Sequence, residues 1–410
     1  MNGQRAERFG RRFPAALLIG GLAVTFVFAA VVTVGHWTPE GLITHDLYNW
    51  AFTIHGVPAL LLLPAVVLFL GELEGAHAGG PAWLIPAAWG ALGLEAAALA
   101  ARLVLGESPT PPSWTGLALF SACALVAPAV LLRRRRPMRA RDAMLVLVSF
   151  VQLVGLGIAV PLDWAKVLDP YLHPTLSSVG HAFTAWTFEA TALAAVAVAV
   201  SDLPGKRGPW VPLLLLLTAT LVPSDSLYQL VSTPAASIGA FWLAALALRG
   251  QALRSTGERL FAALAAMIFL ESTTLGQLLR LMGVDAHLDD TYFVVGLFHL
   301  RAATCVLAVL AVLLRHRQLS RPKLLVYSAA MLSTVGSQLI GFSMVVVGTR
   351  GMPRRYFNYL PEFQPLHRAI AVGGGLFMLG VLLVLFGLWR STFRYGAEAP
   401  LRSAAPHPTA

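Results

Sequence analysis

Twelve long apolar stretches run along the chain, separated by short segments rich in charged residues, proline and glycine. Each is about 20 residues or longer, the length that an α-helix needs to cross a membrane. The apolar residues are continuous and do not alternate with polar ones, so the pattern predicts helices and argues against a membrane β-barrel. The predicted spans are residues 13–36, 49–70, 81–106, 113–132, 142–161, 176–201, 209–228, 231–249, 258–283, 291–315, 323–347 and 366–390.

The two ends of the chain are predicted to lie outside this bundle. Four arginines precede the first stretch, as in a signal peptide, but the stretch is long and lacks a small-residue cleavage site, so we assign it as the first span. The chain then divides into a cytoplasmic N-terminus (1–12), one twelve-helix transmembrane domain (13–390) and a cytoplasmic tail (391–410) that we expect to be disordered.

The composition agrees with an all-α membrane protein. Apolar residues make up 57% of the chain and charged residues only 12%, more apolar surface than a soluble domain of this size could bury. Membrane lipid is therefore the first expected partner. The two cysteines, Cys123 and Cys305, fall inside predicted spans, where a buried apolar thiol is the expected role and no metal-binding cluster is indicated.

Basic residues gather on one side of the predicted bundle. Cytoplasmic loops carry an excess of lysine and arginine, and the N-terminus and the segments after spans 4, 6, 8, 10 and 12 are the basic ones. This places both termini in the cytoplasm, fits a bacterial inner membrane, and accounts for most of the net charge of +10 without a nucleic-acid partner. The outer segments carry acidic residues instead, namely Asp46, Asp163, Asp169, Asp225, Asp289 and Asp290.

One outer segment breaks the charge pattern. Between spans 11 and 12 the chain places Arg354 and Arg355 side by side, with Arg350 before them and Arg368 after. A solvated basic loop is one interpretation. The other is a bound anion at the outer face, because the guanidinium fork binds carboxylates bidentately.

Three of the eleven histidines lie within predicted spans: His55, His181 and His299. His55 and His299 are each several residues into an inward-running span, roughly 10–13 Å below the outer surface. The remaining histidines are expected at span ends or in solvent; they are His36, His45, His77, His173, His287, His316, His367 and His407.

Two histidines at one depth on different helices could hold one low-spin heme. Polar groups inside a membrane are costly and are usually functional. A heme at this depth would direct its propionates outward, toward Arg354 and Arg355, with Tyr356 and Asp290 nearby, which also explains the basic loop. The alternative for the histidines is a hydrogen bond to serine or threonine on a neighbouring helix.

Three segments resemble subunit I of the heme-copper oxidases, specifically the cytochrome c oxidase type. Residues 48–56 (YNWAFTIHG) resemble the start of the family's second helix, whose histidine ligates the low-spin heme. Residues 290–299 (DTYFVVGLFH) resemble its tenth helix, and residues 351–356 (GMPRRY) resemble the loop whose arginines bind heme propionates. The resemblance implies a twelve-helix fold with His55 and His299 as ligands of one heme.

The sequence departs from the family at the oxygen-reducing centre. Leu297 stands where the tenth helix has the high-spin heme ligand, and Thr187 stands where the sixth helix has a copper ligand. Asp289 stands at the magnesium-site histidine, and residues 209–228 contain no histidine at all. The resemblance therefore implies a heme but no copper.

Three functions stay open at this point. The first is a non-catalytic heme-binding electron-transfer subunit of a respiratory or redox complex, partnered by other subunits such as a subunit II-like or cytochrome c-like electron donor. The second is a terminal oxidase or related reductase with unconventional ligands, for which His181 and Glu189 are the candidates. The third is a heme-free scaffold or transport protein.

Four charged residues are predicted near mid-membrane, where they would fill the space of the missing metal centre: Glu95, Glu189, Glu271 and Arg301. An isolated arginine at that depth costs about 2.5–3.5 kcal/mol even on the mildest scale. We therefore expect Arg301 to pair with Glu271 on the neighbouring span, with Glu189 as a further member. The rival interpretation is that each charge reaches its own water-filled pocket.

Overall fold

The computed structural model describes the C-terminal third of the chain most fully. The described residues are 26–32, 34, 37, 44, 47, 51, 191–193, 195–200, 211, 215, 238, 239, 242, 245, 256–281, 288, 291–317, 323–353 and 360–394. The predictions for spans 3 to 5, and for most of spans 1, 2, 6, 7 and 8, lie outside these residues.

Four long helices make up the fully described part. They are α9 (Thr256–Leu281), α11 (Tyr292–Arg317), α12 (Lys323–Thr349) and α13 (Gln364–Arg394), the last preceded by the short 3-10 helix η2 (Pro361–Phe363). Each contains a stretch long and apolar enough to cross a membrane. The predictions for the last four spans are confirmed as helices, with ends that differ by a few residues. The described residues contain no strand, only one isolated bridge between Thr291 and Pro353.

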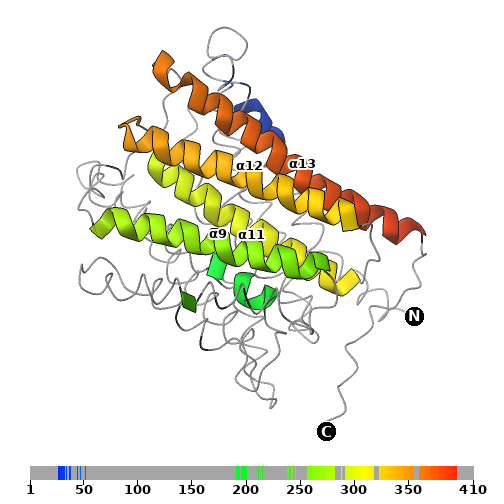
Figure 1. The fold of residues 1–410 in the computed structure, drawn as a ribbon. Coiled ribbons are helices and arrows are strands. Elements are labelled where there is room, and N and C mark those ends of the chain that lie inside the picture. The colour runs from blue at the N-terminus through cyan, green and yellow to red at the C-terminus, as the bar shows by residue number, and fades with distance from the viewer. Residues whose placement is uncertain are drawn as a thin grey trace, which may run out of the picture.

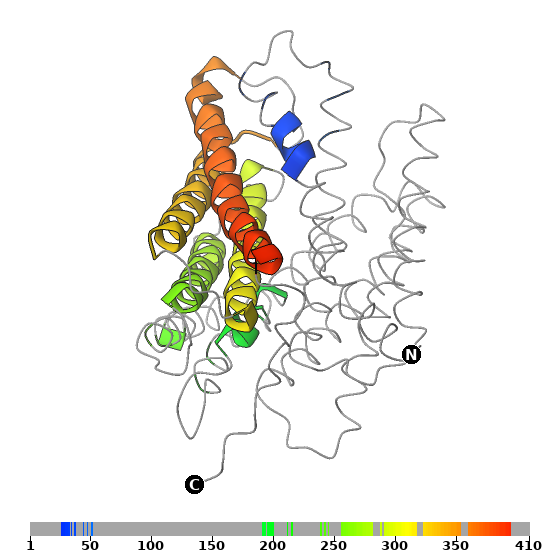
Figure 2. The same cartoon turned by 90° about the vertical axis from the view of Figure 1, so that its right-hand side faces the viewer.

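The helices pack in the order α9, α11, α12 and α13, as Figures 1 and 2 show. The start of α9 lies beside the end of α11, because a Cβ atom added at Gly257 would lie 3.3 Å from Leu314 Cδ1. These two helices are therefore antiparallel, and so are α11 with α12 and α12 with α13. Gly257 also lies against Val326, so α9 runs parallel to α12.

Glycines let these helices approach closely. A Cβ atom at Gly348 of α12 would clash with the backbone of Phe293 in α11. In the same way, Gly336 of α12 and Gly373 of α13 each lie against the other's carbonyl oxygen. Small residues at helix interfaces allow this backbone approach inside membranes, where apolar burial alone does not drive helices together. Gly373 thus serves close helix packing, whereas a Cβ atom at Gly375 would meet nothing within 4 Å.

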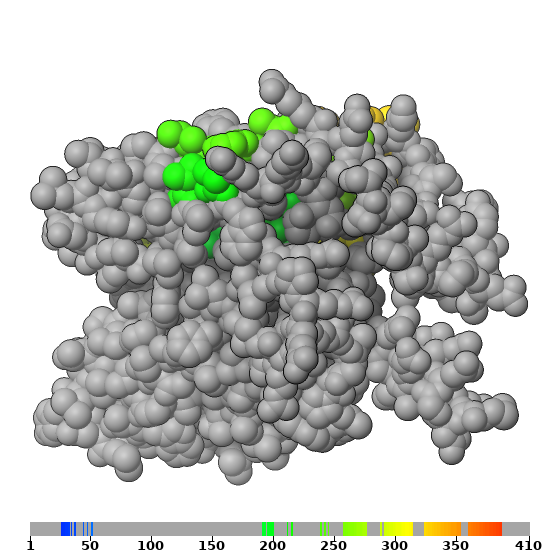
Figure 3. Space-filling model, turned by 90° about the horizontal axis from the view of Figure 1, so that it is seen from below, coloured from blue at the N-terminus to red at the C-terminus, as the bar shows by residue number. Residues whose placement is uncertain are grey.

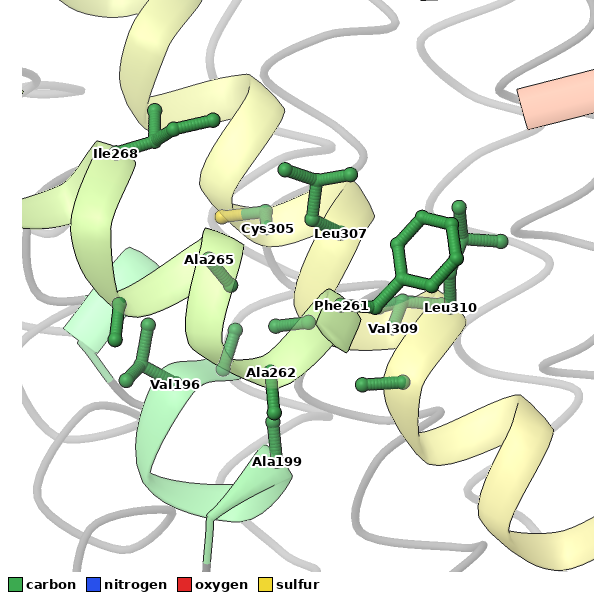
Figure 4. Packing of buried hydrophobic residues seen from close by; sticks show 14 of the residues in the cluster. Val196, Ala199, Phe261, Ala262, Ala265, Ile268, Cys305, Leu307, Val309 and Leu310 are labelled. Atoms are coloured by element: carbon green, nitrogen blue, oxygen red, sulfur yellow. The ribbon is translucent and has the colours of Figure 1, made fainter. Parts of the chain in front are cut away.

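An apolar core joins α9, α11 and the helical residues 195–200 (Figure 4). Val196 and Ala199 lie beside Ala262 and Ala265 of α9, whose opposite side packs on α11. The alanines allow these helices to pack tightly. Residues 191–200 belong to the predicted sixth span, so this contact brings that span against α9.

Apolar side chains also cover the outside of the bundle. Large apolar side chains recur at helical spacing on the exposed faces of α12 and α13; they are Leu324, Met331, Val335, Phe342, Leu379, Leu382 and Phe386. Seen from below, green residues of the middle of the chain reach the surface (Figure 3). Val211, Ile238 and Trp242 are further exposed apolar side chains. Apolar residues both inside and outside are expected of a helix bundle surrounded by lipid.

Candidate functional site

The turn after α12 has a conformation that its sequence dictates. Gly351 adopts φ +85°, the left-handed region that favours glycine. The amide of Gly351 donates to Gly348 O at 2.9 Å and the amide of Met352 donates to Val347 O at 3.3 Å, the two bonds of a Schellman cap. Met352 is buried against Val347 in one apolar cluster. The turn is therefore fixed up to the residue before Arg354.

This turn is joined to the start of α11. The amide of Tyr292 donates to Met352 O at 3.1 Å, and Thr291 forms an antiparallel bridge with Pro353. Thr291 also caps α11, because its Oγ1 accepts from the amide of Phe293 at 3.3 Å. Two of the three segments that resemble the oxidase family, about 60 residues apart in sequence, thus lie side by side at one end of α11.

His299 has the hydrogen bond expected of a metal-binding imidazole. Its Nδ1 lies 2.8 Å from Val295 O, and a carbonyl oxygen only accepts, so Nδ1 carries the proton. In the neutral ring the lone pair is then on Nε2, and a backbone acceptor at the other nitrogen is the usual support of a histidine ligand. The ring is partly buried on α11. This arrangement fits a histidine that ligates heme iron.

The depth of His299 also fits. His299 comes seven positions after Tyr292, so it lies about 10 Å along the helix from the end where Met352 and Pro353 pack. Arg354 follows Pro353 directly in the sequence. The loop that contains the two arginines therefore begins at the end of α11 that lies nearest to His299.

Other members of the predicted heme site lie outside the described residues. They are His55, Asp290, Arg354, Arg355 and Tyr356. Of the predicted second span only Ala51 is described, and it is fully buried, packed with Val32 of the first span. The opposition of His55 and His299 stays a prediction.

His367 was expected at a span end or in solvent; it does lie at the end of a span, in the first turn of α13, but it is not solvated. Its side chain is fully buried at the start of α13. Its Nε2 lies 3.2 Å from Met352 Sδ, and its ring meets the ring of Tyr292 edge-on at 5.4 Å between centroids. The Met352 turn covers the first turn of α13 and keeps His367 from solvent, a tertiary contact that position in a span does not reveal.

Arg368 also has a partner that the sequence did not indicate. Its guanidinium carbon lies 5.8 Å from the ring centroid of Trp37, at the end of the first span, within the range of a cation–π interaction. One of the four outer arginines is therefore held by an aromatic ring. Arg354 and Arg355 remain the pair proposed to bind an anion.

The expected ion pair between Arg301 and Glu271 is not present between these two described residues. The carboxylate of Glu271 instead accepts a hydrogen bond from the amide nitrogen of Gln338 in α12. The Arg301 guanidinium lies beside Gly276, 3.9 Å from a Cβ atom placed there. Side chains lean toward the N-terminus of their own helix, and α9 and α11 are antiparallel, so these two side chains lean apart.

Leu297 and Arg301 share one face of α11. A Cβ atom at Gly276 would lie 3.4 Å from Leu297 Cδ1, and Leu297 is buried with Leu275 and Val345. His299 lies between them in sequence and projects from another face, as residues two apart on a helix do. Glu95 and Glu189, the other members of the predicted mid-membrane cluster, lie outside the described residues.

Three side chains with a part in this region were missed by sequence reasoning. Gln338 could have been found as a lone amide in the middle of an apolar span. Met352 could have been found from its place directly after Gly351, where a cap of this type buries an apolar residue. No sequence signal pointed to the burial of His367.

These helices and their apolar outer faces define an integral membrane protein. Residues 210–376 match the model of the family described as cytochrome c and quinol oxidase polypeptide I. Over this range, which is less than half of the chain, the protein is similar to the heme-copper oxidase subunit I superfamily. The matched range includes His299 and residues 351–356 but not His55.

Two curated relatives are similar over part of their length. Cytochrome c oxidase polypeptide 1 of Halobacterium salinarum is 31% identical over 158 residues, which are 36% of this chain and 26% of that protein. A probable cytochrome c oxidase subunit 1-beta of Nocardia farcinica is 30% identical over 235 residues, 52% of this chain and 36% of that protein. The chain thus spans about a quarter to a third of the length of these relatives.

Proposed function

We propose that this chain is a low-spin heme-binding, electron-transfer subunit of a respiratory or redox complex. The observation that carries the proposal is the pairing of Thr291 and Tyr292 with Met352 and Pro353 at the end of the helix that bears His299. The pairing joins a candidate iron ligand to the loop that continues into two arginines. Such a site would hold a heme by its iron at the histidine and by its two propionates at the arginines.

Each residue of the proposed site has one role. His299 and His55 would hold the heme iron, and the Val295 carbonyl keeps the His299 ring in the tautomer with the lone pair on Nε2. Arg354 and Arg355 would neutralise the propionates, and Tyr356 and Asp290 would lie near them. The bound heme supplies a reversible one-electron couple; the protein supplies the ligands, the depth and the surrounding charge.

The remainder of the molecule follows the twelve-helix prediction in this proposal. Residues 13–390 form one transmembrane domain with both termini in the cytoplasm of a bacterium, and residues 391–410 form a tail. Electrons arrive from a subunit II-like or cytochrome c-like donor in the same complex. The names of the two curated relatives, both cytochrome c oxidase subunits, support such a setting.

The proposal excludes oxygen reduction by this chain. Leu297, at the position of the family's high-spin heme ligand, has an apolar side chain packed into the contact between α9 and α12. It has no atom that can ligate iron. Thr187 and the histidine-free residues 209–228 extend the same departure to the copper ligands.

A reduced-minus-oxidised optical spectrum of the purified protein, recorded with and without carbon monoxide, tests the proposal. We expect a low-spin heme spectrum that carbon monoxide leaves unchanged, because a heme held by two histidines would have no open position for it. A shift with carbon monoxide would indicate an open iron site and favour an oxidase with unconventional ligands. The absence of any heme spectrum after heme-supplemented expression would favour the scaffold function.

A further inference from the structure

Glu271 and Gln338 meet in the middle of the membrane-spanning part. Glu271 lies ten residues before the end of α9, about 15 Å from it, and Gln338 lies near the middle of α12. The Gln338 Nε2 donates to Glu271 Oε2. The two helices run parallel here, and this bond is a direct polar link between them.

Two oxygen atoms of this pair are left over. Glu271 Oε1 and Gln338 Oε1 are both buried, and neither has a hydrogen-bond partner in the structure. Each can only accept if the carboxyl group is ionised, so an ionised Glu271 leaves two acceptors unsatisfied in an apolar interior. Each unsatisfied buried polar group costs about 1–3 kcal/mol, and the charge itself costs more.

One added proton on the carboxyl group would give both oxygens a hydrogen-bond partner. A carboxylic acid and a primary amide form a reciprocal pair, in which the amide N–H donates to one carboxyl oxygen and the carboxyl O–H donates to the amide oxygen. The first of these bonds is the one observed. The two oxygens left over are the atoms that the second bond would join.

We propose that Glu271 and Gln338 form a proton-binding site at mid-membrane, with the proton on Glu271 Oε1 donated to Gln338 Oε1. The ligand is a single proton, and the site is independent of the heme proposed above. Loss of this proton would leave the Glu271 carboxylate facing the Gln338 oxygen. The pair is therefore a place in the membrane interior that can hold or release one proton.

No described cation is bonded to this carboxyl group. The titratable side chains that the structure describes elsewhere on the three packed helices are Glu258 and Arg259 of α9, Tyr292, His299, Arg301 and Cys305 of α11, and Tyr327 of α12. Glu258 and Arg259 lie in the first turn of α9, more than three turns from Glu271. Arg301 is the cation closest in depth, and its guanidinium lies against Gly276.

Infrared spectroscopy of the purified full chain at neutral pH tests the site. We expect the carbonyl stretch of a protonated carboxyl group, sensitive to exchange into deuterium oxide, that disappears in Glu271→Gln. That variant keeps a reciprocal amide–amide pair and should fold. Glu258→Gln, which changes a buried glutamate on the same helix, is the matched control and should leave the band in place.

A second variant tests the pairing itself. Gln338→Leu removes the amide that bonds to the carboxyl group, so the band should move to higher frequency as its carbonyl loses a hydrogen bond. A band unchanged in Gln338→Leu would overturn the pair. A wild-type spectrum with no band assignable to Glu271 would overturn the bound proton, and a carboxylate signal that responds to sodium would assign the two oxygens to a metal cation instead.

Discussion

The backbone amide of Tyr292 donates to the carbonyl oxygen of Met352 at 3.1 Å. This one bond joins the first residue of α11 to the turn after α12. The Schellman cap around Gly351 fixes the position of Met352, whose carbonyl oxygen accepts this bond. The end of α11 and the loop that leads to Arg354 are in this way held in a fixed relation above His299.

Replacing either proposed iron ligand should abolish heme binding. We expect His299→Ala and His55→Ala to lose the heme measured by pyridine hemochrome in the purified protein, since one remaining imidazole leaves the iron without its second ligand. His407→Ala, in the C-terminal tail, is the control and should retain it. Full heme retention in both ligand variants would show that the heme, if any, lies elsewhere.

The arginine pair should raise the heme midpoint potential. Oxidised iron carries one more positive charge than reduced iron, so removing nearby cations stabilises the oxidised form and lowers the potential, on the order of tens of millivolts. We expect this in the variant with Arg354→Gln and Arg355→Gln, measured by redox titration. Arg368→Gln, whose side chain lies over Trp37, should have a smaller effect. An unchanged or raised potential in the double variant, with heme bound, would contradict the assignment.

The sequence predicted the helices better than the contacts between them. Apolar length located α9, α11, α12 and α13 to within a few residues, because crossing a membrane imposes one length on every helix. Resemblance to known motifs indicated that residues 290–299 and 351–356 belong to one site, and the described residues of these two segments do lie together.

Side-chain partners could not be predicted in the same way. Depth alone suggested that Arg301 would meet Glu271, but the direction in which each side chain leaves its helix separates them. His367 was placed by its position in a span, although a turn from another part of the chain buries it. Both depend on which faces of the helices meet, and hydropathy does not specify that.

The purified protein should contain no copper. The residues at the family's copper and high-spin heme positions that we could identify, Thr187 and Leu297, lack a ligating imidazole. Elemental analysis after treatment with a chelator should find iron without copper, and an oxygen electrode should register no consumption with a reduced electron donor. About one copper per chain would contradict this prediction and reopen the oxidase alternative.

Gly351 should be required for conformational reasons alone. A Cβ atom there would meet nothing within 4 Å, yet φ is +85°. We therefore expect Gly351→Ala to lower the free energy of unfolding by about 1–2 kcal/mol, the cost of the left-handed conformation for an L residue. Gly351→Asn should cost less, because asparagine tolerates this region better. Equal thermal stability of the two variants in detergent would argue against strain as the cause.

Two helical glycines should respond differently to the same substitution to alanine. Gly348 lies against the Phe293 backbone, so Gly348→Ala must push α11 and α12 apart and should lower thermal stability in detergent, by about 1–3 kcal/mol for an overpacked contact. Gly375 on α13 has no neighbour within 4 Å of an added Cβ atom. Gly375→Ala should therefore be neutral or should stabilise by about 0.5–1 kcal/mol, because alanine loses less backbone freedom in a helix. Because both variants replace glycine with alanine, comparing them separates the effect of close helix packing from that of helix propensity.

The same two variants should differ in heme potential. Because Phe293 follows Tyr292, Gly348→Ala should also disturb the bond from Tyr292 to Met352. That turn leads to Arg354, so the heme potential should fall, whereas Gly375→Ala should leave it unchanged. Equal stability of the two variants would mean that the close approach of α11 and α12 does not contribute to the fold as described.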